Sequence, residues 1–230
     1  EHSNSDYVLM LVHQLRTPLS ATKWTLKSIL RGDLGPITED QRKFLTHCYE
    51  SNDRMVALAS EMLNFDRLRA GKFEYSFVDV NLSELIRSVI YEVASQAKER
   101  NISIDVKIRP EGLPAVSVDV TKMRSVLHNF LENAIKYTPP GGMIAISVSE
   151  EKGALKLSIK DSGIGIPKDQ QKDIFEKFFR AKNAVKRERS GSGLGMYIVK
   201  SFIEGHGGKV WFESEEGKGT TFYFTIPIDR

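Results

Sequence analysis

The first seventy residues carry apolar positions with the spacing of paired helices. In the first segment the spacings alternate between four and three, a heptad seam made of Val8, Val12, Leu15, Leu19, Thr22, Leu26 and Ile29. A Gly- and Pro-rich turn at 31–36 ends this segment. Thr38 and Gln41 then fit a capping box at the start of a second helix. The pattern predicts a helical hairpin over residues 1–72.

The second helix carries two apolar stripes. The first stripe comprises Phe44, Cys48, Ser51, Met55, Leu58, Met62 and Phe65, and the second comprises Leu45, Tyr49, Asn52, Val56, Ala59 and Leu63. One hairpin cannot bury both stripes, whereas two hairpins can do so as a four-helix bundle. We therefore expect a homodimer. The alternative is a monomeric hairpin that packs on the second half of the chain.

Beyond the hairpin the pattern changes to short alternating segments mixed with helices. Strands are expected at 73–78, 102–108, 143–149, 154–160, 209–213 and 220–226, and helices at 81–100, 119–137, near 170 and at 194–205. A Gly-, Ser- and Arg-rich stretch at 181–192 is expected to be irregular. Helices among mostly antiparallel strands predict a two-layer α+β sandwich over residues 73–230.

Composition and charge narrow the classes of partner. The chain has 230 residues with a net charge of +3, which gives no case for nucleic acid. The longest apolar run, residues 7–12, is far shorter than the roughly 20 residues that cross a bilayer. Membrane attachment is thus expected only through a segment upstream of residue 1. The single cysteine, Cys48, fits a reducing, cytoplasmic setting, including that of the cytoplasmic part of a membrane-anchored sensor.

Polar side chains gather on one face of the helix expected at 119–137. Asn129, Asn133 and Lys136 stand at i, i+4 and i+7, so they share that face. An amide oxygen is a hard ligand suited to Mg²⁺, and a lysine can meet phosphate as a point charge. Taken alone, this cluster fits a solvated polar face better than a ligand site.

Two further clusters follow along the chain. Asp161, Gly163 and Gly165 come directly after a strand, where a carboxylate can accept a hydrogen bond from the exocyclic amine of adenine. An ordinary turn is the alternative. Phe178 and Arg180 belong to a segment with three aromatics in five residues, which can anchor a mobile segment or simply fill the core.

The fourth cluster opens the helix expected at 194–205. It consists of Gly191, Gly193, Leu194 and Gly195. Backbone N–H groups at a helix start form an anion site. The spacing is neither the Rossmann fingerprint nor a Walker motif.

The first helix contains a histidine that lies close to a proline. His13 follows an a position of the heptad, so it stands at a solvent-facing b position. Pro18 lies one turn later, removes the hydrogen bond to the Gln14 carbonyl and should bend the helix.

In this order, the four clusters closely resemble the N, G1, F and G2 boxes of the ATP-binding domain of sensor histidine kinases, a Bergerat-type fold. Residues 13–18 resemble the H box of the same family, so the resemblance covers nearly the whole chain. It implies Mg²⁺ coordination by Asn133 with Asn129 close by, phosphate contacts from Lys136, a ribose or phosphate-side contact from Tyr137, and adenine recognition by Asp161. The five glycines would shape the pocket, Arg180 would stabilise the transferred phosphoryl group, and residues 181–192 would form a lid.

The resemblance also implies a reaction. His13 would accept the phosphoryl group of ATP through Nε2 and pass it to an aspartate of a response regulator receiver domain. Thr17 would position water when phosphate is removed from that regulator. Gln14 departs from the family pattern, which usually has an acid there. Glutamine cannot act as a base, but its amide oxygen can accept Nδ1–H and fix the tautomer, so we expect slower autophosphorylation.

Two other functions remain open from the residues. The chain can be a regulatory scaffold that binds ATP and transfers nothing, which only Gln14 favours. It can also be a different Bergerat-fold ATPase, although such proteins lack an H-box hairpin before the ATP domain.

Overall fold

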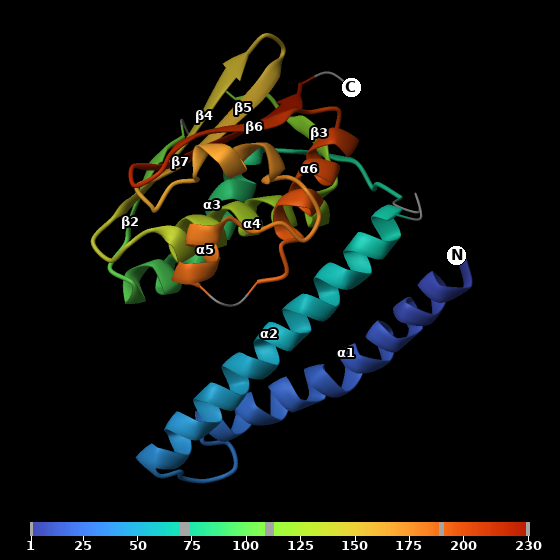
Figure 1. The fold of residues 1–230 in the computed structure, drawn as a ribbon, viewed down its shortest axis with the longest axis vertical. Coiled ribbons are helices and arrows are strands. Elements are labelled where there is room, and N and C mark those ends of the chain that lie inside the picture. Colours follow the sequence, from blue (N-terminus) through green and yellow to red (C-terminus); the bar gives the residue numbers. More distant parts are fainter. Residues whose placement is uncertain (1, 70–73, 109–112, 189–190, 229–230) are drawn as a thin grey trace. The chain divides into compact units, whose positions relative to one another are not determined.

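The structure is a computed structural model that describes residues 2–69, 74–108, 113–188 and 191–228. The side chains of 2–13, 61 and 64–69 lie outside this description. The chain forms two compact units, Glu1–Phe73 and Glu74–Arg230 (Figure 1).

The first unit is a hairpin of two long helices, α1 (His2–Arg31) and α2 (Glu39–Arg69). The predicted capping box begins α2: Thr38 N–H donates to Gln41 Oε1 at 2.9 Å, and Gln41 N–H donates to Thr38 Oγ1 at 3.2 Å. This reciprocal pair satisfies two backbone donors that a helix start leaves open.

The two stripes of α2 have different environments within one hairpin. On the second stripe Asn52, Ala59 and Leu63 are buried, and Asn52 Nδ2 donates to the Leu19 carbonyl of α1 at 2.8 Å. On the first stripe the large apolar side chains Phe44, Met55, Leu58 and Met62 are all at least 45% exposed. One hairpin therefore covers one stripe, as the pattern predicted.

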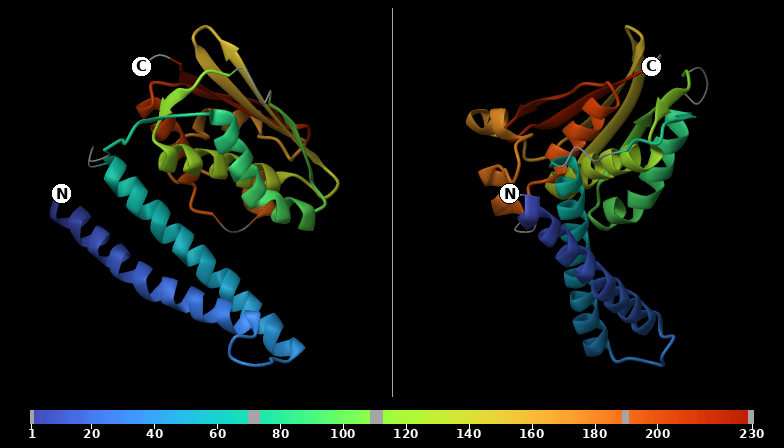
Figure 2. Two further views of the ribbon diagram at one scale, coloured as in Figure 1. Left: turned by 180° about the vertical axis from the view of Figure 1, so that it is seen from behind. Right: turned by 90° about the vertical axis from the view of Figure 1, so that its right-hand side faces the viewer.

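The second unit is built on a five-stranded sheet in the order β2-β4-β5-β7-β6. The strands are β2 (Ser103–Lys107), β4 (Met143–Glu151), β5 (Ala154–Asp161), β6 (Val210–Glu215) and β7 (Gly219–Pro227). Only β2 and β4 run parallel. Helices α3 (Leu82–Glu99), α4 (Val120–Tyr137) and α6 (Gly195–Gly205) cover one face (Figure 2). This is the predicted two-layer α+β sandwich.

Capping side chains set the starts of α3 and α4. Asn81 accepts the Ser83 N–H at 3.0 Å, and Asp119 accepts the Lys122 N–H at 3.0 Å. Both helices then bury an apolar stripe against the sheet and each other. Phe130 of α4, for example, contacts Phe222 and Phe224 of β7. The predicted helix bounds are confirmed to within one or two residues.

Three expectations need correction. The strand expected at 73–78 is instead β1 (Val78–Val80), which pairs with β3 (Val116–Val118), a strand that was not predicted. The segment 182–187, expected to be irregular, is helix α5 (Lys182–Arg187). The helix expected near 170 is the 3₁₀ helix η1 (Lys168–Asp173).

These differences have physical causes. Tyr75 and Phe77 do alternate, but their rings pack on His206, so the alternation marks a tertiary contact and not a sheet ladder. The strand β3 has only three residues, too few for an alternation to stand out.

Among the described helices, none carries an apolar stretch long enough to span a bilayer.

Candidate active site

Helix α4 presents the predicted polar face beside the start of α6. Asn129 and Asn133 are half-buried, and Asn129 Nδ2 donates to the Ser125 carbonyl at 2.9 Å. A Cβ on Gly195 would lie 2.5 Å from Asn129 Oδ1, so only glycine lets α6 begin this close. The amphipathic pattern of α4 thus fixes which side chains face the G2 cluster.

The end of α4 is joined to the loop after β5. Ile164 N–H donates to the Tyr137 carbonyl at 3.2 Å, and a Cβ on Gly163 would lie 2.8 Å from the same oxygen. Lys136 and Tyr137 are half-buried at this junction. The first two clusters therefore form one continuous surface.

Asp161 is buried at the end of β5, with 7% of its surface exposed. Its Oδ1 atom accepts the N–H of Gly163 at 2.8 Å and the N–H of Thr220 at 3.2 Å. Burial raises the pKa of the carboxyl to about 6, and these two backbone donors oppose that rise. Among the described residues, no hydrogen bond reaches Oδ2. The carboxylate is thus fixed by one oxygen and leaves the other for a ligand donor.

The loop that contains Gly165 is held against the β6–β7 turn. Gly217 N–H donates to the Ile164 carbonyl at 2.8 Å, and Ile166 N–H donates to Ser214 Oγ at 2.9 Å. Gly165 itself has a φ of +61° and lies against the Glu215 carbonyl. These bonds keep the loop next to Asp161.

Thr220 is a site residue that the sequence analysis missed. It is buried, it supports Asp161 through its N–H, and its hydroxyl bonds Ser214 Oγ at 2.8 Å. The available signal was a Gly-Lys-Gly-Thr turn between two strands, in which a polar residue stands at a buried position. Pattern alone gave no reason to link this turn to Asp161.

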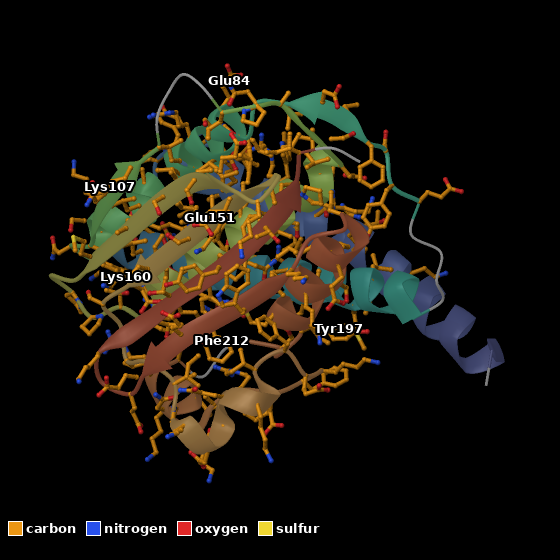
Figure 3. The ribbon with its side chains drawn as sticks, turned by 90° about the horizontal axis from the view of Figure 1, so that it is seen from above. Glu84, Lys107, Glu151, Lys160, Tyr197 and Phe212 are labelled. Carbon is orange, nitrogen blue, oxygen red and sulfur yellow. The ribbon has the colours of Figure 1, made fainter. Side chains whose placement is uncertain are left out.

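The aromatic F cluster touches the G2 cluster. A Cβ on Gly193 would lie 2.6 Å from the Phe178 carbonyl carbon, so the two backbones are in direct contact. Phe178 is 62% exposed and has a φ of +62°, unusual for a residue with a Cβ. Phe175 is half-buried, and its ring packs at 5.8 Å on that of Phe212 in β6 (Phe212 is labelled in Figure 3). The aromatics of this segment are therefore half-buried or exposed, and none is fully buried.

Residues 181–192 begin as an anchored segment. Ala181 is buried, Lys182 N–H donates to Gln170 Oε1 at 2.8 Å, and Asn183 Nδ2 donates to the Gly165 carbonyl at 2.9 Å. The Arg180 guanidinium donates to the carbonyls of Glu188 and Gly191. Arg180 thus bonds the far part of the same segment. Residues 189–190 lie outside the described residues.

The G2 cluster leads into α6. Leu194 is buried at the N-cap position, and its N–H donates to Ser192 Oγ at 3.0 Å. The side chain of the N-cap residue Leu194 makes no hydrogen bond to the first turn, which starts at Gly195. Backbone N–H groups at a helix start of this kind can bind an anion.

The candidate acceptor lies in the other unit. His13 belongs to α1, but its side chain is outside the described residues, so its solvent-facing position stays a prediction. Gln14, Thr17 and Pro18 are exposed, and α1 continues through Pro18 as one helix. Thr22 Oγ1 donates to the Pro18 carbonyl at 2.9 Å.

Known families match both units. A profile described as "His Kinase A (phospho-acceptor) domain" matches residues 3–71. A second, "Histidine kinase-, DNA gyrase B-, and HSP90-like ATPase", matches residues 118–230. The catalytic domain of histidine kinase ThkA is 35% identical with a TM-score of 0.58, and the match covers 97% of that domain and 66% of this chain. The chain belongs to the sensor histidine kinase family.

Longer relatives show how much of such a protein the kinase chain represents. Sensor histidine kinase WalK of Bacillus subtilis is 32% identical over 99% of this chain and 37% of its own length. Adaptive-response sensory kinase SasA of a Synechococcus strain is 32% identical over 96% of this chain and 58% of its own length. The crystal structure of full-length ShkA in complex with AMPPNP matches with a TM-score of 0.76, 30% identity, and coverage of 96% of this chain and 45% of that one. The chain therefore spans between about a third and three-fifths of these proteins.

Proposed function

We propose that this chain binds ATP with Mg²⁺ and transfers the terminal phosphoryl group to His13, from which it passes to a response regulator. The observation that carries the proposal is the meeting of four sequence clusters around α4. Asn129 lies against Gly195, and Tyr137 lies against Gly163. The F cluster contacts the G2 cluster at Gly193.

Asp161 would recognise adenine. Its Oδ1 atom already accepts two backbone N–H groups, and Oδ2 can accept the exocyclic amine of adenine. The largely buried setting strengthens such a bond, since the local dielectric is lower than in water. The closely packed glycines at 163 and 165 let the backbone approach the flat base.

The phosphates would lie between α4 and the start of α6. The α6 N-terminus offers backbone donors, and Lys136 offers a positive charge. Asn133 would hold Mg²⁺ by its amide oxygen, with Asn129 close by, and Mg²⁺ commonly takes its other ligands from phosphates and water. This donor fits the ion, because an amide oxygen is a hard ligand of the kind that Mg²⁺ takes. Bound Mg²⁺ would neutralise charge on the phosphates.

The transfer forms a P–N bond to His13 Nε2 and breaks the bond between the γ-phosphorus and the bridging oxygen, so ADP leaves with that oxygen. Gln14 would accept Nδ1–H and keep Nε2 unprotonated for attack. The surplus Nδ1 proton later passes to water, since glutamine cannot take it. Arg180 would stabilise the transferred group once its bonds to the lid carbonyls are exchanged.

Exposed surfaces of the hairpin indicate which proteins this chain would bind. The uncovered first stripe of α2 supports a homodimer through a four-helix bundle. A receiver domain would then take the phosphoryl group onto an aspartate, and exposed Thr17 would position water for its later removal. Because ATP and such regulators are found in the cytoplasm, we place the chain there, and the longer relatives support its being the cytoplasmic part of a longer sensor.

Autophosphorylation with labelled ATP and Mg²⁺ tests the proposal. We expect an acid-labile, base-stable phosphate that is lost in His13→Ala and Asn133→Ala. A chain that binds nucleotide but acquires no label would instead be a regulatory scaffold. Label that persists in His13→Ala would exclude His13 as the acceptor.

A further inference from the structure

The first described residues of the ATP-binding unit bond or pack against α4 and α6. They do so at the helix ends that lie away from the proposed nucleotide site. Residues 74–77 directly follow the boundary between the units. Ser76 N–H donates to Asp119 Oδ2 at 3.1 Å, and the Glu74 carbonyl accepts Lys122 Nζ at 2.9 Å. Both partners stand at the start of α4. We call residues 74–77 the entry strap.

Asp119 therefore has two structural roles. Its Oδ1 atom caps α4, and its Oδ2 atom bonds the strap and Lys122 Nζ. The carboxyl is 5% exposed, and although burial favours the neutral acid, the Lys122 bonds hold its pKa below the usual range. The charged Asp119 carboxylate thus connects the strap to α4 through its hydrogen bonds.

His206 joins the same point to the end of α6. It is 1% exposed, and its Nε2 atom accepts the Asp119 N–H at 3.0 Å. Its Nδ1–H then donates to the Phe202 carbonyl at 2.6 Å, which defines the neutral tautomer. The edge-on rings of Tyr75 and Phe77 each lie 5.3 Å from the imidazole.

Among the strap residues, Tyr75 packs most closely against its neighbours. Its ring stacks on Phe77 at 5.4 Å, and Lys122 Nζ lies 4.7 Å from its centroid. Its hydroxyl lies directly against Gly205, where a Cβ has no space. A side chain at position 205 would therefore push Tyr75 off the helix end.

Helix α4 contacts both ends of α6. Asp119, at the start of α4, bonds His206 just beyond the end of α6, and Asn129, in the middle of α4, lies against Gly195 at the start of α6. Ten residues separate Asp119 from Asn129, which is about 15 Å along a helix. The strap consequently holds the spacing of α4 and α6 without reaching the nucleotide.

We propose that the entry strap, with His206 and Asp119 as positioning residues, sets how the ATP-binding unit delivers the phosphoryl group to His13. This rests on the proposed function. The strap is the only described part of the second unit that directly follows the hairpin in the chain, and it is fastened to both helices that hold ATP. Loosening it should disturb the geometry of transfer more than the binding of nucleotide, because transfer depends on alignment to within about 1 Å.

The test separates transfer from binding in the complete chain. In Gly205→Ala and Tyr75→Ala we expect the single-turnover autophosphorylation rate at saturating ATP to fall by roughly tenfold or more. The dissociation constant of a non-hydrolysable ATP analogue should change by less than about twofold. Tyr75→Phe, which keeps the ring contacts, should retain most of the rate. Tyr223→Leu removes a half-buried aromatic that stacks on Trp211, outside the strap, and serves as the control.

Three outcomes would overturn the inference. One is an unchanged rate in both strap variants. Another is a rate loss that matches the loss of folded protein, followed by thermal unfolding. The third is a loss confined to nucleotide affinity, since that would make the strap a support for the pocket alone. Failure of the unaltered chain to form phosphohistidine would instead contradict the proposed function.

Discussion

Gly195 begins α6 so close to Asn129 that a Cβ would lie 2.5 Å from its Oδ1 atom. This contact joins the face of α4 that we propose to bind Mg²⁺ to the start of α6 that we propose to bind phosphate. Its two partners were predicted separately, from an i, i+4 pattern and from a glycine cluster.

Gly195→Ala should weaken nucleotide binding by about tenfold, because the new methyl group must displace Asn129 or the helix start. The dissociation constant of an ATP analogue with Mg²⁺ measures this. The matched experiment is a double-mutant cycle with Asn129→Ala, which removes the clashing oxygen. If the double variant binds much more weakly than Asn129→Ala alone, steric conflict with Asn129 is not the cause.

Nucleotide affinity should depend on pH through Asp161. Its pKa is raised to about 6 by burial, so the carboxylate that we propose to accept the adenine amine is lost as pH falls through this value. One pH unit below the pKa, affinity should have fallen by about tenfold. Calorimetric titration from pH 5 to 8 measures this in the wild-type protein and in Asp161→Asn. Phosphate protonation on the ligand is common to both proteins, so an equal pH dependence in the variant would assign the effect to the ligand.

Gln14→Glu should accelerate autophosphorylation. The new carboxylate can take the Nδ1 proton, and general-base help is typically worth about 10²–10⁴-fold. Gln14 is exposed, so the fold should tolerate the change. Single-turnover rates at saturating ATP give the measurement, with Gln14→Ala as a slower comparison that lacks the hydrogen bond. A Gln14→Glu protein no faster than wild type would remove the base argument.

Leu58→Asp should dissociate the homodimer. Leu58 lies on the uncovered first stripe and is 45% exposed within one hairpin, so a carboxylate there would be buried unpaired in a four-helix bundle. Sedimentation velocity measures the mass. Ala57→Asp, one residue away and on neither stripe, should stay dimeric. A wild-type chain that sediments as a monomer would contradict the bundle itself.

The sequence was most informative where one local rule was sufficient. The Thr38–Gln41 capping box, the Asn81 cap and the polar face of α4 each follow from side chains within one or two helical turns. The same patterns could not identify Thr220, because its role depends on a strand pair that brings it to Asp161. They also misassigned Tyr75 and Phe77, since alternation does not tell a sheet partner from a buried histidine. Helix α5 was missed because its six residues form less than two turns, too few for a helical pattern to stand out.

The hydrogen bond from Thr220 to Asp161 also bears on how the protein folds. Its partners are 59 residues apart, and the strand that carries Thr220 is the last of the described strands. The support of the Asp161 carboxylate is therefore complete only after β7 has docked between β5 and β6. A chain still emerging from the ribosome would hold the N box and Asp161 but not the fully supported carboxylate. Nucleotide binding should thus select fully folded molecules and protect them against unfolding by mass action.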